Sequence, residues 1–426
     1  MNIWIVNQGE PIPTQVNWQK RLHRSTYFAK YLASNGWKVS LWTSTFDHAS
    51  KEQIHNTDYE LELENNLKVY FLRTEGYKNH VSLNRLRDQN LFSKRLIHAF
   101  STVEPPDLIY CSYPPVDLAF QCVKYGLKNK IPTIVDVRDM WPDIIPYFVH
   151  WSFRLFAYIG LIPMFYQSRY CIRNATSVLG ITPNFLEWAQ KISKRLNKSY
   201  DTWIPFTYIP KVKTNSPPKY IRDTSINFNL QLTPTDFVIS YFGSLGRNPQ
   251  LETAIMGQKI LKEKGYPTKL LICGDGDYKD KYKAMSGIND DIFFLGFLDS
   301  ATLVHIMKIS SVGLNPMPQR FDFQATINNK AVEYFSGSLP ILHSPNNGYL
   351  ADLVKLNRCG VAYNYNDVDD YVAKVQDLLD NKEVLKEYSK NAYKVYLENF
   401  KPKIVLEKME RHFQFIVSQK LNTFSN

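Results

Sequence analysis

The feature that most constrains this chain is a regular alternation of short apolar segments with longer amphipathic ones. In the first half, the apolar runs predict strands at 2–6, 37–42, 67–72, 107–111, 133–137 and 175–180. Between them, three- and four-residue spacing of apolar side chains predicts helices at 18–35, 84–102, 116–128 and 185–196. Such alternation is typical of a parallel sheet covered by helices on both faces. We therefore expect a doubly wound α/β domain here.

The same alternation restarts in the second half. Strands are predicted at 237–242, 269–273, 292–295, 312–315, 339–342 and 360–363. Helices are predicted at 251–265, 300–308, 367–380, 382–400 and 404–419, with a shorter one beginning near residue 328. The pattern fails between 199 and about 235, where Pro205, Pro210, Pro217 and Pro218 lie among polar residues. We expect domains at 1–205 and 206–403, with a last helix at 404–420 packing back on the first.

Charge is distributed unequally along the 426 residues. The whole chain carries a net +11; residues 1–213 hold 26 Lys/Arg against 17 Asp/Glu, and residues 214–426 hold 25 against 23. The first half is therefore expected to face an anionic partner or a negatively charged membrane surface. Nucleic acid is the competing partner, but the basic residues are scattered and no RNP, zinc-knuckle or basic-heptad signature is present. We expect no nucleic-acid partner.

Cysteine usage and hydropathy bear on the compartment. The five cysteines are far apart and form no CxxC pair, which fits reduced thiols in the cytoplasm. No uninterrupted apolar run approaches the roughly 18 residues of a membrane span. The amino terminus, MNIWIVNQGEP, has no basic segment or cleavage site and is expected to be a first strand.

The stretch TINNKAVEYFSGSLPILHS, residues 326–344, predicts a loop, a short helix and a strand. Asn328 or Asn329 can cap the helix, and Lys330, Glu333 and Tyr334 then share one face. A helix N-terminus suits a phosphate, and a carboxylate one turn later can accept hydrogen bonds from ribose hydroxyls. The alternative is an ordinary surface helix with a Lys/Glu ion pair.

Polar, glycine-containing loops follow the other predicted strands of the second half. Gly243 and Ser244 lead to Arg247; the next loop holds Gly274, Asp275 and Gly276; a third holds Gly296, Phe297 and Leu298. Because the carboxyl ends of parallel strands meet at one edge, these loops are candidates for a ligand site. Arg247, Lys330 and the amides near Asn328 are the candidate diphosphate binders. For each loop alone, simple turn chemistry is the alternative.

In the first half, Arg138 and Asp139 come directly after the predicted strand 133–137, at a ligand-binding position of α/β proteins. The alternative is an ion pair that caps a loop. The following segment 151–171, WSFRLFAYIGLIPMFYQSRYC, is aromatic and is interrupted by Gly160 and Pro163. It predicts either an amphipathic segment in a membrane interface or a buried packing segment between helices.

No metal site is expected. Asp367, Asp369 and Asp370 form a DxD string, but it precedes a helix, where acidic residues are ordinary capping and dipole partners. The nine histidines have no ligand spacing.

The motifs together resemble the retaining GT-B glycosyltransferases of family 4, most of all the bacterial branch that assembles O-antigen and capsule and includes fucosamine transferases. The resemblance covers nearly the whole chain. It is carried by Arg21 and Arg24 and by the motifs RDMWPD (138–143), FGSLGR (242–247), GDG (274–276), GFL (296–298) and INNKAVEYFSGSLPI (327–341). Glu333 matches the second glutamate of a pair eight positions apart; Ala325 stands in place of the first.

The resemblance implies two Rossmann-like domains facing each other across a cleft. It implies a hexosyltransferase-type enzyme that takes a UDP-sugar donor, with Glu333 on the ribose, Arg247 and Lys330 on the diphosphate and Phe297 and Leu298 near the base. It assigns Arg138 and Asp139 to orienting the acceptor or the sugar, and needs no cofactor. The acceptor would be a polyprenyl-diphosphate-linked saccharide, and the protein would be cytoplasmic and peripheral on the inner membrane.

Two other functions remain open at this point. A sugar-nucleotide epimerase shares the same architecture and would turn over without an acceptor. A non-catalytic nucleotide or polyanion binder would need the same basic loops but no turnover.

Overall fold

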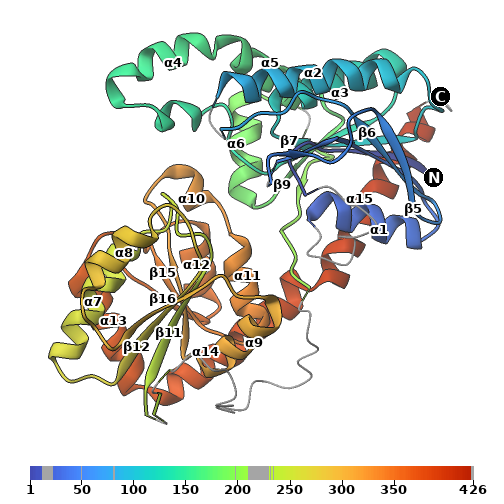
Figure 1. The fold of residues 1–426 in the computed structure, drawn as a ribbon. Helices are drawn as coiled ribbons and strands as arrows, with labels where there is room; N and C mark the ends of the chain where they lie inside the picture. Colours follow the sequence, from blue (N-terminus) through green and yellow to red (C-terminus); the bar gives the residue numbers. More distant parts are fainter. Residues whose placement is uncertain are drawn as a thin grey trace. The chain divides into compact units, whose positions relative to one another are not determined.

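The computed structural model describes residues 1–11, 23–48, 50–79, 82–196, 198–209, 230, 232–233 and 235–423. The chain forms two compact units (Figure 1). Unit 1 comprises Met1–Pro205 and Leu406–Asn426, and unit 2 comprises Phe206–Val405. The expected connection residues Pro210, Pro217 and Pro218, and Arg21, lie outside the described residues.

Unit 1 is built on an eight-stranded sheet in the order β10-β9-β8-β7-β1-β2-β6-β5. The strands are β1 (Asn2–Val6), β2 (Lys38–Ser44), β5 (Tyr59–Glu64), β6 (Leu67–Leu72), β7 (Leu108–Tyr113), β8 (Thr133–Val137), β9 (Ser177–Gly180) and β10 (Thr202–Trp203). Strands β3 (Phe46–Asp47) and β4 (Glu52–Gln53) form a separate antiparallel pair. The chain order reverses between β1 and β7, so this is a doubly wound sheet with its switch point there.

The helices of unit 1 are α1 (Arg24–Ser34), α2 (Leu83–Phe100), α3 (Val116–Asn129), α4 (Arg154–Gly160), α5 (Ile162–Asn174) and α6 (Pro183–Ser193), with short turns η1 (Ile145–Phe148) and η2 (Trp151–Phe153). Four of these helices, α1, α2, α3 and α6, follow the predicted alternation, whereas α4 and α5 were not predicted as helices. Ser82 and Thr182 cap α2 and α6 with their hydroxyls. The predicted first helix began at residue 18; the described helix begins at Arg24, and residues 12–22 lie outside the description.

Two strands of the main sheet of unit 1 were not predicted, and neither was the separate β3–β4 pair. Strand β5 pairs antiparallel with β6 at the edge of an otherwise parallel sheet, and its YELELE alternation places every second residue toward solvent. Strand β10 has only two residues and lies in the proline-containing stretch after 199. Short or half-exposed edge strands carry too little apolar pattern to be predicted from sequence.

Unit 2 contains a six-stranded, fully parallel sheet in the order β13-β12-β11-β14-β15-β16. The strands are β11 (Phe237–Phe242), β12 (Thr268–Cys273), β13 (Ile292–Gly296), β14 (Val312–Pro316), β15 (Ile341–Ser344) and β16 (Gly360–Ala362). This is the doubly wound order with its switch point between β11 and β14. The predicted α/β fold with parallel sheets is therefore confirmed in both units.

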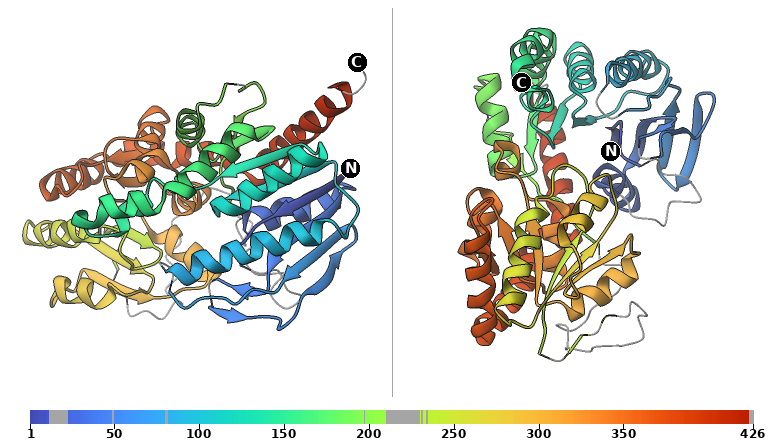
Figure 2. Two further views of the ribbon diagram at one scale, coloured as in Figure 1. Left: turned by 90° about the horizontal axis from the view of Figure 1, so that it is seen from above. Right: turned by 60° about the vertical axis from the view of Figure 1, so that its left-hand side comes forward.

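Helices cover both faces of the unit 2 sheet (Figure 2). They are α7 (Leu251–Glu263), α8 (Lys279–Ser286), α9 (Ser300–Ile309), α10 (Phe321–Ala325), α11 (Asn329–Ser336), α12 (Tyr349–Leu356), α13 (Val368–Asp380), α14 (Lys382–Val395) and the π-turn η3 (Tyr396–Phe400). Alternate residues of β11 belong to two cores: Val238 and Phe242 pack with α9, α11 and α12, whereas Ile239 and Tyr241 pack with α7 and α13. Helices α8, α10 and α12, which have eight, five and eight residues, were not predicted.

The last helix, α15 (Pro402–Thr423), contacts the body of unit 1 from residue 406 onward (Figures 1 and 2). The Phe413 ring lies against Trp37 (6.4 Å between centroids) and Tyr110 (5.4 Å). The Glu410 carboxylate accepts hydrogen bonds from the Trp37 indole (2.9 Å) and the Asn35 amide (2.8 Å). The helix therefore supplies part of the hydrophobic core of unit 1.

Truncation of Phe413 tests this packing. Phe413 is completely buried and Phe415, two residues on, is 42% exposed. Phe413→Ala should lower the free energy of unfolding of unit 1 by about 3 to 5 kcal/mol, because it leaves a cavity. Phe415→Ala should cost less than about 1 kcal/mol. All eight tryptophans precede residue 206, so tryptophan fluorescence in a urea titration reports on unit 1. Equal losses for the two variants would contradict this packing.

Candidate functional site

Helix α11 is fixed to the unit 2 sheet by Tyr334. The backbone pairing of β11 with β14 reaches only Ser240 and Gly313. Beyond it, the Tyr334 hydroxyl accepts a hydrogen bond from the Phe242 N–H (3.1 Å) and donates toward the Leu314 carbonyl (3.1 Å). The ring lies so close to Gly313 that a Cβ there would approach it to 2.6 Å. Tyr334 thus bridges the two strands at the switch point.

The amino end of α11 is capped as predicted. The Asn328 side chain accepts a hydrogen bond from the Ala331 N–H at 2.9 Å. Its amide donates to the Asn315 side chain at 2.7 Å, at the end of β14. Asn329, the other candidate cap, is the first helical residue and its side chain is exposed. The helix N-terminus is therefore tied to the carboxyl edge of the sheet.

Lys330 lies against the loop that follows β11. Its Nζ is 3.6 Å from the centroid of the Tyr241 ring. A Cβ at Gly243 would lie 3.0 Å from the lysine Cε and 3.1 Å from Nζ, so Gly243 makes room for this side chain. Burial lowers the pKa of Lys330 to about 7, and the Glu333 carboxylate opposes that shift only in part. A second negative charge near Nζ would stabilise the ammonium form.

Glu333 is a buried carboxylate with unused acceptor capacity. The residue is only 7% exposed. Among the described residues, no side chain or backbone donor hydrogen-bonds to its carboxylate, and no cation lies within ion-pair distance. The alternative interpretation, an ordinary surface helix with a Lys/Glu ion pair, is therefore wrong. A carboxylate in this state is suited to accept hydrogen bonds from ligand hydroxyls.

The loops after β11 and β12 are joined backbone to backbone. The Gly243 N–H donates to the Cys273 carbonyl (2.9 Å), and the Leu245 N–H donates to the Asp275 carbonyl (2.9 Å). A Cβ at Gly274 would lie 1.8 Å from the Gly243 oxygen. Gly276 approaches the Leu245 backbone in the same way, at 2.8 Å. The close contact between the two loops is therefore sufficient reason for glycine at these two positions.

The remaining predicted donor-site residues lie at the same sheet edge but are exposed. Ser244 and Arg247 lie in the loop after β11, and Arg247 forms no ion pair within the described part of the chain. The Asp275 carboxylate pairs with Lys279 at 2.9 Å. After β13, Phe297 is 86% exposed, whereas Leu298 packs on the core. The structure brings Gly243 next to both Lys330 and Gly274, and Gly276 next to Leu245 of the same loop.

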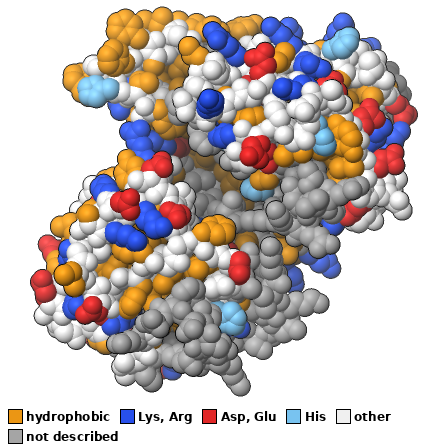
Figure 3. Space-filling model, in the orientation of Figure 1, with side chains coloured by type: hydrophobic (Ala, Val, Ile, Leu, Met, Phe, Trp, Pro, Cys, Tyr) orange, Lys and Arg blue, Asp and Glu red, His pale blue; other side chains and the backbone are white. Residues whose placement is uncertain are grey.

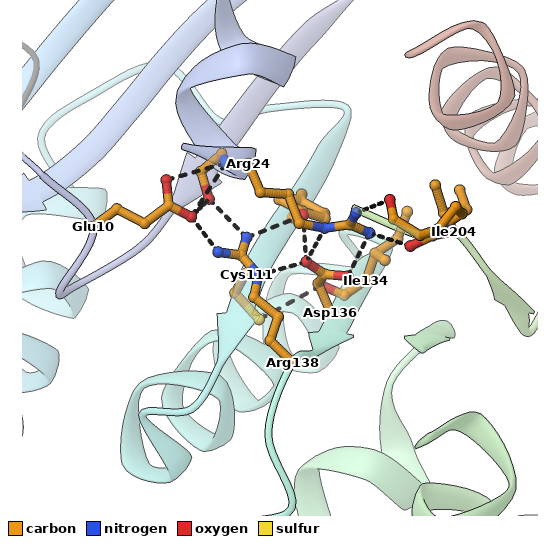
Figure 4. Close-up of polar contacts among 10 residues, drawn as sticks. Glu10, Arg24, Cys111, Ile134, Asp136, Arg138 and Ile204 are labelled. Atoms are coloured by element: carbon orange, nitrogen blue, oxygen red, sulfur yellow. Dashed lines mark hydrogen bonds and ion pairs between the residues drawn. The ribbon is translucent and has the colours of Figure 1, made fainter. Parts of the chain in front are cut away.

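Unit 1 has its own polar cluster at the carboxyl edge, centred on Asp136 of β8 (Figure 4). The Arg24 guanidinium donates to both Asp136 oxygens, at 2.8 and 3.1 Å. The Arg138 Nε donates to Asp136 at 2.6 Å, and its other nitrogens donate to Glu10, Ser25 and Tyr110. Arg24 also donates to the carbonyls of Ile204 (2.9 Å) and Pro205 (2.7 Å), the last residues before unit 2.

This cluster changes the interpretation of Arg138. Its guanidinium is fully engaged by protein groups, so it is an internal ion-pair partner, as the loop-capping alternative proposed. Asp139 is half-buried, and its carboxylate accepts a hydrogen bond from the Met140 N–H at 2.8 Å. Glu10, Tyr110 and Asp136 were missed by sequence analysis. An aspartate inside the apolar strand TIVDV was the available signal, because a buried carboxylate needs a cationic partner.

Competing effects set the pKa of Asp136. Burial raises it, but the charges of Arg24 and Arg138 and their hydrogen bonds outweigh burial and lower it to about 2. The folded state therefore holds Asp136 as a carboxylate, and its contribution to stability is present above the unfolded pKa near 4. That contribution is lost as the pH falls from about 4 toward 2.

The segment 151–174 forms η2, α4 and α5. None of the residues of η2 and α4 is buried, so the buried packing interpretation is wrong for them. Trp151 is 72% exposed, and Phe153, Leu155, Phe156 and Ile159 are also exposed. Figure 3 shows hydrophobic side chains gathered over the part of unit 1 where Figure 1 labels α4. No described helix is long and apolar enough to cross a membrane.

The acidic string before α13 has structural partners. Asp367 caps the helix by accepting a hydrogen bond from the Asp370 N–H at 2.9 Å. The Asp370 carboxylate accepts one from the Asn364 N–H at 2.7 Å. Within the described residues, no three His, Cys, Asp or Glu side chains gather as a metal site. All five cysteines are buried and unpaired.

A family comparison decides the class of unit 2. Residues 223–395 match the family model described as glycosyl transferases group 1. Unit 2 is a group 1 glycosyl transferase domain. The protein is therefore a glycosyltransferase, as predicted. No curated protein sequence matches the chain.

Solved structures match this glycosyltransferase over nearly its whole length. Sucrose-phosphate synthase from Thermosynechococcus elongatus superposes with a TM-score of 0.70 at 14% identity, covering 98% of this chain and all of that one. HepE from Anabaena in complex with UDP-glucose gives 0.63 at 12%, covering 99% and 100%. WaaG, a glycosyltransferase involved in lipopolysaccharide biosynthesis, gives 0.61 at 13%, covering 96% and 99%. These likenesses confirm the predicted GT-B fold.

The Asp136 cluster of this glycosyltransferase gives a testable pH dependence. Asp136→Asn should lower the stability of unit 1 by about 3 to 5 kcal/mol at pH 7, because two buried guanidinium groups lose their counter-charge. The difference from wild type should shrink as the pH falls below about 4, where Asp136 becomes protonated in the unfolded wild-type chain but stays ionised in the folded state. Urea titrations followed by tryptophan fluorescence at pH 7, 5 and 3.5 measure it.

Asp58→Asn is the matched control, because Asp58 pairs with Arg95 at the surface, 2.8 Å away and 49% exposed. It should cost no more than about 1 kcal/mol at any of these pH values. A pH-independent loss for Asp136→Asn would show that its charge does not stabilise the fold.

Proposed function

We propose that this glycosyltransferase transfers a sugar from a UDP-sugar to a hydroxyl of a lipid-linked saccharide, with retention, during assembly of a surface polysaccharide such as O-antigen or capsule. The observation that carries the proposal is the pair on α11: a lysine of lowered pKa and a buried carboxylate without a donor. Both lie at the carboxyl edge of a doubly wound sheet. The UDP and UDP-glucose complexes of HepE support the donor class, and the role of WaaG supports the pathway.

The proposed donor contacts are all assigned to residues of unit 2. Lys330 and the exposed Arg247 neutralise the diphosphate, near the loops of Gly243, Ser244 and Gly274–Gly276. Glu333 accepts hydrogen bonds from ribose hydroxyls. Asn329 presents its amide at the helix N-terminus, and Phe297 and Leu298 border the base. Asp275 holds its loop through Lys279. The glycine loops are fixed by backbone hydrogen bonds.

In the reaction, the bond between the anomeric carbon and the diphosphate oxygen breaks while the acceptor hydroxyl forms the new glycosidic bond on the same face. The hydroxyl proton passes to the leaving phosphate oxygen. The cations stabilise the charge that develops on the diphosphate. No carboxylate nucleophile and no metal are assigned. Asp139 orients the acceptor, and Arg138 positions the loop that carries Asp139.

The proposed place of action is the inner face of the cytoplasmic membrane, where the protein is peripheral. The exposed apolar residues of η2 and α4 enter the interface, and the excess of Lys/Arg in the first half attracts anionic lipid. A polyprenyl-diphosphate-linked acceptor is presented at the same surface.

A donor screen with membrane-extracted lipid-linked acceptor tests the function, with release of nucleoside diphosphate as the readout. One UDP-sugar should turn over only when acceptor is present. Lys330→Ala should lower kcat by roughly 10²- to 10³-fold, because a group that stabilises the leaving charge is lost. Lys264→Ala, at an exposed lysine beyond α7, should leave it unchanged.

Three results would contradict the proposal. Conversion of a UDP-sugar without acceptor would indicate an epimerase, and UDP binding without any turnover would indicate a non-catalytic binder. Equal activity of Lys330→Ala and Lys264→Ala would remove the assigned role of Lys330.

A further inference from the structure

A groove of about 640 Å³ runs along helix α5 in unit 1. One face of α5 forms its floor, at three- and four-residue spacing. The lining residues are Asp143, Tyr158, Ile162, Phe165, Tyr166, Arg169, Tyr170, Arg173 and Asn174. None of them belongs to the Asp136 cluster or to the donor edge of unit 2.

The floor of the groove changes character along the helix. Its beginning is apolar: Ile162 is 60% exposed, and the Phe165 ring stacks on Tyr158 of α4 with 6.1 Å between centroids. Its end is cationic, with Arg169 and Arg173. At 1.5 Å per residue, Ile162 and Arg173 are roughly 16 Å apart along the axis. A ligand that fills the groove therefore has an apolar end and an anionic end.

The cationic end is a built feature. Arg169 lies over the Phe165 ring, 5.9 Å from its centroid, and the Arg173 Nε donates to the Ser193 carbonyl at 2.7 Å. Neither arginine forms an ion pair within the described part of the chain. Two guanidinium groups on one helix face suit a phosphate or diphosphate.

The same groove contains an acceptor without a donor. The Asp143 Oδ2 is buried and has no hydrogen-bond partner among the described residues. Asp143 and Arg169 line the same groove; burial raises the pKa of Asp143, and its backbone hydrogen bond and then the charge of Arg169 oppose that shift. A hydroxyl next to the bound anion would satisfy this oxygen.

The apolar end adjoins the exposed hydrophobic surface of η2 and α4. The sequence connection is direct, because α4 ends at Gly160 and α5 begins at Ile162. A hydrocarbon chain at Ile162 and Phe165 would thus continue over side chains that already face solvent. This continuity favours a lipid over a free sugar phosphate.

We propose that the groove along α5 binds the phosphate-bearing end of one lipid-linked saccharide: hydrocarbon at Ile162 and Phe165, phosphate at Arg169 and Arg173, and a hydroxyl of the first sugar at Asp143. The proposal rests on the proposed function and specifies where its acceptor is held. The groove selects a single lipid molecule by its phosphate, in addition to any general attraction of unit 1 to a bilayer.

Calorimetric titration of the full chain with three probes tests the site: farnesyl diphosphate below its micelle concentration, farnesol, and inorganic diphosphate. Farnesyl diphosphate should bind at least tenfold more tightly than either of the others, because it alone occupies both ends. Arg169→Glu and Ile162→Glu change exposed side chains, so the core is preserved. Each should weaken farnesyl diphosphate at least tenfold, and Ile162→Glu should leave inorganic diphosphate unchanged.

Arg87→Glu is the matched control, at an exposed arginine of α2 outside the groove. Equal weakening by Arg87→Glu would show nonspecific charge attraction and overturn the proposal. Equal affinity for inorganic diphosphate or for farnesol would also overturn it, in favour of a free-anion site or a purely apolar one. UDP binding to the same variants is also measured, which keeps the two proposals separate. If the groove binds farnesyl diphosphate but no sugar is transferred, only the proposed function is rejected. If sugar transfer is unaffected by Arg169→Glu, only the groove proposal is rejected.

Discussion

The Tyr334 hydroxyl, held between β11 and β14, is the contact on which the carboxyl edge of the unit 2 sheet depends. It occupies the point where the two strands separate, and Gly313 leaves space for its ring. This anchors α11 by its middle turn, so that Lys330 is set against Gly243 and Glu333 is buried beside it. The Asn328 cap fixes the other end of the same helix. Tyr334 and Asn328 thus position two ionisable side chains, Lys330 and Glu333.

The charged side chains at the carboxyl edges of the two sheets differ in how far protein groups pair with them. In unit 1, the guanidinium groups of Arg24 and Arg138 are saturated by Asp136, Glu10, hydroxyls and carbonyls, which makes that edge a rigid structural centre. In unit 2, no donor among the described residues hydrogen-bonds to the Glu333 carboxylate, and Lys330 lies against the Tyr241 ring with its pKa lowered to about 7. Buried charge that the protein leaves uncompensated costs stability, and a ligand of complementary charge relieves that cost. The contrast explains why the nucleotide is assigned to unit 2.

Much of this architecture follows from the sequence. The parallel strands were predictable because strands buried on both faces are apolar throughout, and the Asn328 cap and the α13 cap at Asp367 follow from local side-chain chemistry. The edge strands β5 and β10 were missed because their apolar pattern is weak. The partners of Arg138 were missed because Glu10 and Asp136 are far from each other in sequence and meet only through the sheet. For the same reason, no spacing rule could predict that Lys330 lies against the Tyr241 ring. Nor could it show that Gly274 is needed for the contact with the Gly243 backbone.

The most direct test of the central claim is the affinity of UDP and 2′,3′-dideoxy-UDP for wild type and Glu333→Gln, measured by calorimetry. If Glu333 accepts hydrogen bonds from the ribose, the variant should bind UDP at least tenfold more weakly than wild type, because hydrogen bonds to a charged group contribute roughly 1.5 to 3 kcal/mol. The two proteins should then bind the dideoxy nucleotide equally. An equal loss of affinity for both nucleotides would contradict the account, since the carboxylate would then act on something other than the ribose hydroxyls.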